Sequence, residues 1–253
     1  DEVMVGSVNK HAIATVGICF LIAVIEGIDI QAAGIAAAGI REHFGLDSSQ
    51  LGIFFSAGIL GLLPGALVGG RIADRIGRKK VLTWSTIIFA FFTLCTVWVN
   101  SFNSLLFVRF AAGFGLGAAM PILITLAAEA VSPQNRGRAV GLMYCGMPVG
   151  AAIISLVAST EFGGNWKNIF YLGGLLPIFV VPLMLWLLPE SKEFLNAQKA
   201  KQDAVTTETP SSFKGLFNNE NRLKTCYIWV SYFFTLMVVY IMLSWLPSLF
   251  TEL

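Results

Sequence analysis

Long apolar stretches alternate with short polar segments along most of this chain. A hydrocarbon core about 30 Å thick requires roughly 20 mostly apolar residues per crossing helix. Seven stretches reach about this length, at approximately residues 12–38, 49–70, 81–99, 103–130, 138–159, 168–188 and 224–249. The pattern therefore predicts an all-α membrane protein with seven transmembrane helices.

The spacing of these helices divides the chain into four parts. A short N-terminal tail, residues 1–11, precedes six closely spaced helices within residues 12–188. Residues 189–222 are rich in Lys, Gln, Thr and Ser, which is typical of a flexible linker. One further helix follows within residues 223–253. We expect a six-helix bundle, a cytoplasmic linker and the start of an incomplete second bundle, so the chain looks truncated.

The composition supports a lipid-facing chain and excludes several classes of protein. Hydrophobic residues make up 56% of the sequence and charged residues 13%, against about 25% charged in soluble domains. The net charge of +2 is too small to indicate nucleic-acid binding. His11 and His43 have no acidic or cysteine partner at ligand spacing, so we expect no metal. No nucleophile, base and orienting group recur at usable spacing, so we expect neither an enzyme nor a cofactor.

The positive charges predict the orientation in the membrane. All but three of the 17 Lys and Arg residues fall on one set of predicted helix ends. Arg41 and Lys167 lie on the opposite set, and Arg109 lies inside a helix. Because loops rich in Lys and Arg stay in the cytoplasm, we expect a cytoplasmic N-terminus.

Two acidic residues interrupt the first apolar stretch. Glu26 and Asp29 are three residues apart, which places both carboxyl groups on nearly the same face of a helix. An ionised group near the bilayer centre costs at least about 2.5 to 3.5 kcal/mol, so each needs a partner or a wet cavity. A pair of carboxyl groups in a medium of low dielectric is a candidate proton carrier. The alternative is a pair of cavity-facing acids that only hydrates the pore or caps a kink at Gly27.

Arg109, in the fourth apolar stretch, is a candidate for binding a substrate carboxylate. Its planar guanidinium suits bidentate capture of such a group. The alternative is a permanent salt bridge to Glu26 or Asp29, and both interpretations hold if substrate competes for the arginine. Glycine and proline interrupt the second and fifth stretches in matching positions, which indicates an inverted repeat around a substrate cavity.

Several motifs resemble those of the major facilitator superfamily. The stretch GGRIADRIGRKK, residues 69–80, resembles the signature between its second and third helices. Arg109 with Gly113, the stretch Pro133 to Gly137, and the Pro-Glu-Ser at 189–191 resemble three further motifs of the family. The resemblance implies twelve helices in two bundles that give alternating access to a central site.

Within that superfamily, the EGID motif at residues 26–29 resembles the acid-Gly-x-Asp motif of the aromatic acid:proton symporters. Longer stretches of the sequence are similar to members of this family that transport 3-phenylpropionate and 3-(3-hydroxyphenyl)propionate. The resemblance implies that Glu26, Asp29 and Arg109 are critical for transport. From their positions alone, Phe54, Phe55 and Tyr144 are candidate contacts for a substrate ring, with packing or lipid contact as the alternative.

The resemblance also implies a cytoplasmic gate around the loop after the second helix. Its residues, with Glu129 as the expected ionic partner of the loop arginines, are Gly70, Asp74, Arg75, Gly77, Arg78 and Glu129. In the family the loop aspartate docks on a helix of the second bundle, which we expect to be missing here. The alternative is that the basic loop only anchors the topology.

Together these features predict a secondary active transporter of the bacterial inner membrane. We expect it to import an aromatic carboxylic acid, similar to 3-(3-hydroxyphenyl)propionate, with protons as the coupling ion. The alternatives are a transporter of another small organic anion and a truncated half-transporter without activity of its own.

Overall fold

The computed structural model describes residues 2–203 and 222–252 of the chain. These residues form helices joined by short turns, and no strand occurs among them. The helices are α1 (Glu2–Phe44), α2 (Ser48–Ile76), α3 (Arg78–Cys95), α4 (Phe102–Glu129), α5 (Arg136–Tyr144), α6 (Gly146–Ala158), α7 (Trp166–Leu187), α8 (Lys192–Asp203) and α10 (Arg222–Glu252). Two 3₁₀ turns are also present, η1 (Pro133–Asn135) and η2 (Phe162–Gly164).

Each predicted apolar stretch lies in a helix, which confirms the all-α membrane fold. The fifth stretch is divided between α5 and α6, which meet at Cys145. Among the described residues, six helical segments are long and apolar enough to cross a membrane. The helix outside these six, α3, begins with Arg78, Lys79 and Lys80, so its apolar part is shorter than its 18 residues.

Two segments expected to be irregular contain helix. α1 begins at Glu2 and therefore includes most of the predicted N-terminal tail. Within the predicted linker, α8 forms because its sequence is rich in strong helix formers and because the Ser191 hydroxyl accepts a hydrogen bond from the Phe194 amide. The rest of the linker, residues 204–221, lies outside the described part of the chain.

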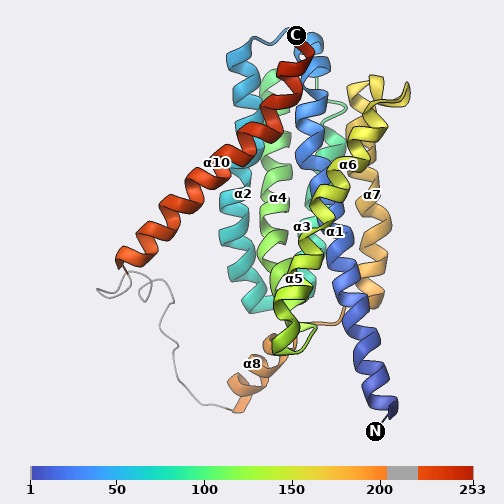
Figure 1. The fold of residues 1–253 in the computed structure, drawn as a ribbon, viewed down its shortest axis with the longest axis vertical. Coiled ribbons are helices and arrows are strands. Elements are labelled where there is room, and N and C mark those ends of the chain that lie inside the picture. The colour runs from blue at the N-terminus through green and yellow to red at the C-terminus, as the bar shows by residue number, and fades with distance from the viewer. Residues whose placement is uncertain (1, 204–221, 253) are drawn as a thin grey trace.

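The helices α1 to α7 form an upright bundle (Figure 1). α8 lies at the end of the bundle that holds the N-terminus, and we call this the α8 end. α10 runs obliquely along one side and contacts α1. The junctions between α2 and α3 and between α7 and α8 meet at the α8 end, where Arg78 and Glu190 are in contact.

At several helix crossings the backbones of the two helices are in direct contact, and two of these crossings link distant parts of the chain. A side chain added at Gly65 of α2 would overlap the backbone of Phe114 in α4. Likewise, a side chain at Gly150 of α6 would overlap the backbone of Val24 in α1. Glycine permits this approach, as it does in other membrane helix pairs. In each pair, one helix (α2 or α1) comes from the first three predicted apolar stretches and the other (α4 or α6) from the next three. An inverted repeat of two three-helix units would produce this pairing.

The apolar interior forms two clusters along the bundle axis. One contains α1 residues from Ile18 to Ile25 and lies toward the α8 end, and the other contains α1 residues from Ile28 to Ile40. Asp29 and Arg109 lie near the level at which these clusters meet. The fold therefore places the predicted charged residues deep inside the helix bundle.

Candidate functional site

The three charged residues predicted from the sequence are all buried in the bundle. Glu26, Asp29 and Arg109 are respectively 2%, 3% and 6% exposed. The Arg109 Nη1 atom donates to Asp29 Oδ1 at 3.0 Å, and Nη2 donates to Oδ2 at 3.4 Å. Of the ion pairs considered from the sequence, the structure therefore contains the one between α1 and α4 through Asp29.

Glu26 has different surroundings from Asp29, although both belong to one motif. Within the described residues, its Oε1 atom is buried and has no hydrogen-bond partner. Its carboxyl group lies within electrostatic range of Asp29, of Tyr144 at the end of α5 and of Tyr240 of α10. The two acids are therefore a paired and an unpaired carboxyl group one helical turn apart.

Aromatic rings enclose the guanidinium of Arg109. Its central carbon lies 5.9 Å from the ring centroid of Phe54 and 5.5 Å from that of Phe170. Both distances are within the range of cation–π attraction. Phe54 was a predicted candidate, and here it contacts the arginine. Phe170 comes from α7, and the sequence contains no signal that places it beside α4.

A small cavity of about 40 Å³ lies beside the ion pair. A buried water requires about 10 to 15 Å³, so this space holds more than one small polar group. Arg109, Asp29, Gly58, Phe55 and Tyr240 are among the residues that line it. Of the three predicted ring contacts, Phe55 therefore faces this cavity.

A larger cavity of about 360 Å³ adjoins it between α2 and α10. Phe55, Ile59 and Tyr240 line both cavities. The rings of Phe55 and Trp245 meet in the larger one, with centroids 5.5 Å apart. Tyr144 lines neither of these two cavities. Tyr240 and Trp245 were not predicted, because a position on α10 gives no information about packing against α2.

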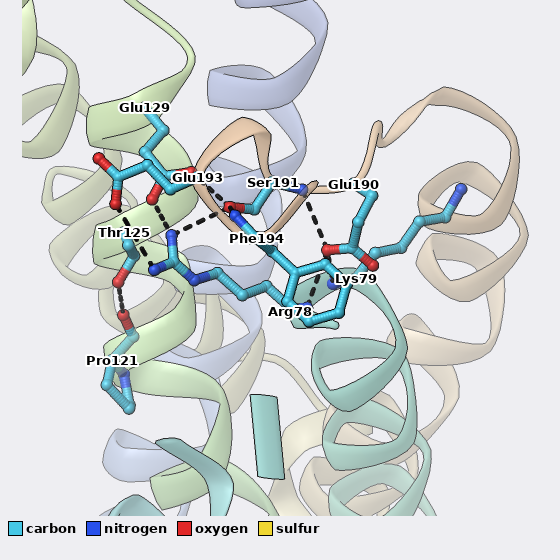
Figure 2. Close-up of polar contacts among 9 residues, drawn as sticks. All are labelled: Arg78, Lys79, Pro121, Thr125, Glu129, Glu190, Ser191, Glu193 and Phe194. Atoms are coloured by element: carbon cyan, nitrogen blue, oxygen red, sulfur yellow. Dashed lines mark hydrogen bonds and ion pairs between the residues drawn. The ribbon is translucent and has the colours of Figure 1, made fainter. Parts of the chain in front are cut away.

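A second polar cluster lies at the α8 end (Figure 2). The guanidinium of Arg78 forms an ion pair with Glu129 at the end of α4, as the resemblance led us to expect. It also lies 3.8 Å from Glu193 and donates to the Ser191 hydroxyl at 3.2 Å. Ser191 in turn donates to Glu129 at 2.6 Å. The cluster joins the start of α3, the end of α4 and the start of α8.

Glu190 caps the first turn of α3 from a distant part of the chain. Its Oε1 atom accepts from the amides of Arg78 at 2.8 Å and Lys79 at 3.0 Å, and from the Ser191 amide at 3.0 Å. A carboxylate also interacts favourably with the positive end of the helix dipole. Gly77 has φ of 106°, and a side chain there would overlap the Glu190 carboxylate. The motif glycine thus makes room for the cap.

The other residues of the expected gate remain outside this cluster. Asp74 and Arg75 are exposed and make no ion pair among the residues that the structure describes. Gly70 has no atom within 4 Å of the position of an added side chain. Their roles stay predictions.

The fold and its buried charges define a multi-pass integral membrane protein, and the chain belongs to the Major Facilitator Superfamily, which residues 19–253 match. It is 48% identical to the 3-(3-hydroxy-phenyl)propionate transporter of Escherichia coli K12, over 97% of this chain and 59% of that protein. It is also 36% identical to the 4-hydroxybenzoate transporter PcaK of Acinetobacter baylyi, over 93% of this chain and 57% of that protein. The family assignment from the motifs is confirmed.

A solved structure of a D-xylose-proton symporter has the same fold. The TM-score is 0.74 at 17% sequence identity, over 95% of this chain and 62% of that one. This likeness concerns the fold alone. The chain spans less than two thirds of the length of these three relatives.

Proposed function

We propose that this chain is part of a secondary active transporter that imports an aromatic carboxylic acid with protons. The observation that carries the proposal is a buried arginine that lines a small cavity, which adjoins a larger cavity lined by several aromatic side chains. The names of two relatives support the substrate class, since they are a hydroxyphenylpropionate transporter and a hydroxybenzoate transporter. On this basis 3-(3-hydroxyphenyl)propionate is the first substrate to test.

In this proposal, the two cavities divide the substrate between them. The substrate carboxylate binds at Arg109, because a guanidinium is the side chain best suited to bidentate contact with a carboxylate. The ring occupies the larger cavity, among Phe55, Tyr240 and Trp245. Offset and edge-to-face contacts with such side chains favour an aromatic substrate over an aliphatic one.

The charges of the site give a reason for coupling to protons. Asp29 and Arg109 neutralise one another, so an arriving carboxylate adds one negative charge to a region of low dielectric. A proton bound at the same time cancels that charge. Glu26 and Asp29 are the candidate proton carriers, and the proposal requires no resident cofactor or metal.

Alternating access requires that the site open to each side of the membrane in turn. We propose that the cluster of Arg78, Glu129 and Ser191 belongs to the cytoplasmic gate, and that the protein lies in a bacterial inner membrane with its N-terminus in the cytoplasm. The Lys and Arg residues that gather at the α8 end support this orientation.

The test is uptake of radiolabelled 3-(3-hydroxyphenyl)propionate by cells that express the complete gene encoding this sequence. We expect accumulation above the empty-vector control and its loss on addition of a protonophore. No accumulation, or accumulation that a protonophore leaves unchanged, contradicts the proposal. An aliphatic acid that outcompetes all aromatic acids would favour another organic anion as substrate. Expression of the 253 residues alone tests whether this part inserts without transporting.

A further inference from the structure

The surroundings of Arg109 leave one part of its guanidinium without a partner. A guanidinium offers donors along two usable edges, an end edge with Nη1 and Nη2 and a side edge with Nε and Nη2. Asp29 occupies the end edge, and the rings of Phe54 and Phe170 cover the group. Within the described residues, Nε is buried and has no hydrogen-bond partner. The Nε donor is therefore desolvated and without a partner, and it shares the side edge with the second hydrogen of Nη2, the atom that also donates to Asp29.

The space beside this side edge exists because residue 58 is glycine. A Cβ atom at Gly58 would lie 3.6 Å from Nη2 and 4.0 Å from Nε of Arg109. These are ordinary van der Waals distances, so alanine fits the fold while it covers both donors. Gly58 and Arg109 both line the small cavity of about 40 Å³. Glycine at this position thus keeps the side edge open to a ligand.

We propose that the substrate carboxylate binds the Nε and Nη2 edge of Arg109, in the space that Gly58 leaves open, while Asp29 keeps the end edge. This inference rests on the proposed function and adds to it the binding mode of the anion. The substrate joins the existing ion pair and does not displace Asp29. Gly58 is then a specificity-determining position, because its missing side chain admits the carboxylate.

The dimensions of the site agree with this binding mode. The small cavity has room for a carboxylate but not for a benzene ring, so the ring must lie in the adjoining cavity of about 360 Å³. Phe55 and Tyr240 line both spaces and would lie beside the substrate where it passes between them. A primary amide of the same shape offers one acceptor oxygen and a donating NH2 group, so it can accept from only one of the two donors of the side edge.

The experiment compares the preference for acid over amide in Gly58→Ala and in a matched control. In cells that express the complete gene, uptake of labelled 3-(3-hydroxyphenyl)propionate is measured in the presence of 3-phenylpropionate or of its primary amide. The preference is the ratio of inhibition by the acid to inhibition by the amide. The control is Gly141→Ala in α5, where no atom lies within 4 Å of the added methyl group. We expect Gly58→Ala to reduce the preference for the acid about 10- to 100-fold, the loss typical of a charge-assisted hydrogen-bonded contact. Gly141→Ala should keep the wild-type preference.

Arg109→Lys gives an independent second test. Lysine keeps a positive charge for Asp29 but has no side edge, so the preference for the acid should fall in this variant as well. An unchanged preference in Gly58→Ala, or in Arg109→Lys, would overturn the inference while wild-type uptake leaves the proposed function standing. Absence of aromatic-acid uptake by the wild type would overturn both.

Discussion

At the scale of single residues, the two acids of the EGID motif differ in whether a partner compensates their charge inside the membrane. Asp29 is compensated by Arg109 through two hydrogen bonds, whereas Glu26 has an unpaired buried oxygen. An ionised carboxyl group without a partner is costly at this depth. Asp29 therefore has the surroundings of a structural ion pair, and we expect Glu26 to be the carboxyl group of the two that binds and releases a proton.

The first prediction concerns the ion pair. Asp29→Asn removes the charge that compensates buried Arg109, and breaking such a pair costs about 3 to 5 kcal/mol of stability. The matched control is Asp74→Asn, because Asp74 is exposed and makes no ion pair among the described residues. Its effect should stay within about 0.5 kcal/mol. Thermal unfolding in detergent measures both, and equal unfolding temperatures for the two variants would show that the pair does not stabilise the fold.

The second prediction concerns the proton. Glu26→Gln keeps the size of the side chain but cannot bind and release a proton at neutral pH. We expect membrane vesicles with this variant to exchange labelled for unlabelled substrate at close to the wild-type rate. They should lose accumulation driven by a pH gradient, because substrate movement no longer requires a proton. Accumulation equal to the wild type would exclude Glu26 as the carrier.

The sequence identified the charged residues of the site but not their pairing. Glu26, Asp29 and Arg109 are recognisable because ions in apolar stretches are rare. A three-residue spacing places both acids on one face, and only the rotation of α1 against α4 decides that Asp29 meets the arginine. Phe170 and Tyr240 come from other helices, so no local pattern could assign them to the site.

At the scale of helices, the length of the apolar stretches predicted every apolar helix. The residue at which a helix begins can instead depend on contacts with residues distant in the sequence. α3 begins at Arg78 because the amides of its first turn donate to Glu190. The sequence around Gly77 contains no capping side chain of its own, and the residue at the N-cap makes no side-chain hydrogen bond. α8 was predicted as linker because a short polar helix has no apolar periodicity to reveal it.

The third prediction tests this distant cap. Glu190→Ala leaves the first amides of α3 without an acceptor, and loss of a cap costs about 0.5 to 2 kcal/mol. Glu193→Ala is the control, because that side chain is 59% exposed and lies 3.8 Å from Arg78. An exposed pair of this kind contributes at most about 1 kcal/mol. Thermal unfolding should therefore show the larger loss for Glu190→Ala, and the reverse order would contradict the assignment of the cap.

At the scale of the whole molecule, the six-helix bundle and α10 differ in the fraction of their side chains that is buried. The bundle contains both apolar clusters, apart from a peripheral contact by Trp245. Most of the described side chains of α10 between Arg222 and Met242 are exposed. The buried core that holds the Asp29 and Arg109 pair thus consists of residues that precede α10 in the chain. α10 contributes to the walls of the cavities instead, through Tyr240 and Trp245.

The last prediction separates these two contributions. A chain that ends after Asp203 lacks α10 but keeps the ion pair and all buried members of both apolar clusters, because these lie between Ile18 and Leu188. Its unfolding temperature in detergent should lie within about 4 °C of that of the 253-residue chain, which corresponds to about 1 kcal/mol at this size. Asp29→Asn in the 253-residue chain should lower the temperature further than the deletion does.

In contrast to thermal stability, the affinity for an aromatic acid should fall clearly on deletion of α10. Without Tyr240 and Trp245 the larger cavity loses one wall, so an aromatic acid loses ring contacts while its carboxylate still reaches Arg109. We expect weaker binding of 3-phenylpropionate by isothermal titration, with little change for acetate, which has no ring to place. A large loss of thermal stability on deletion would instead make α10 part of the core. An equal loss of affinity for both acids would place the ring elsewhere than between α2 and α10.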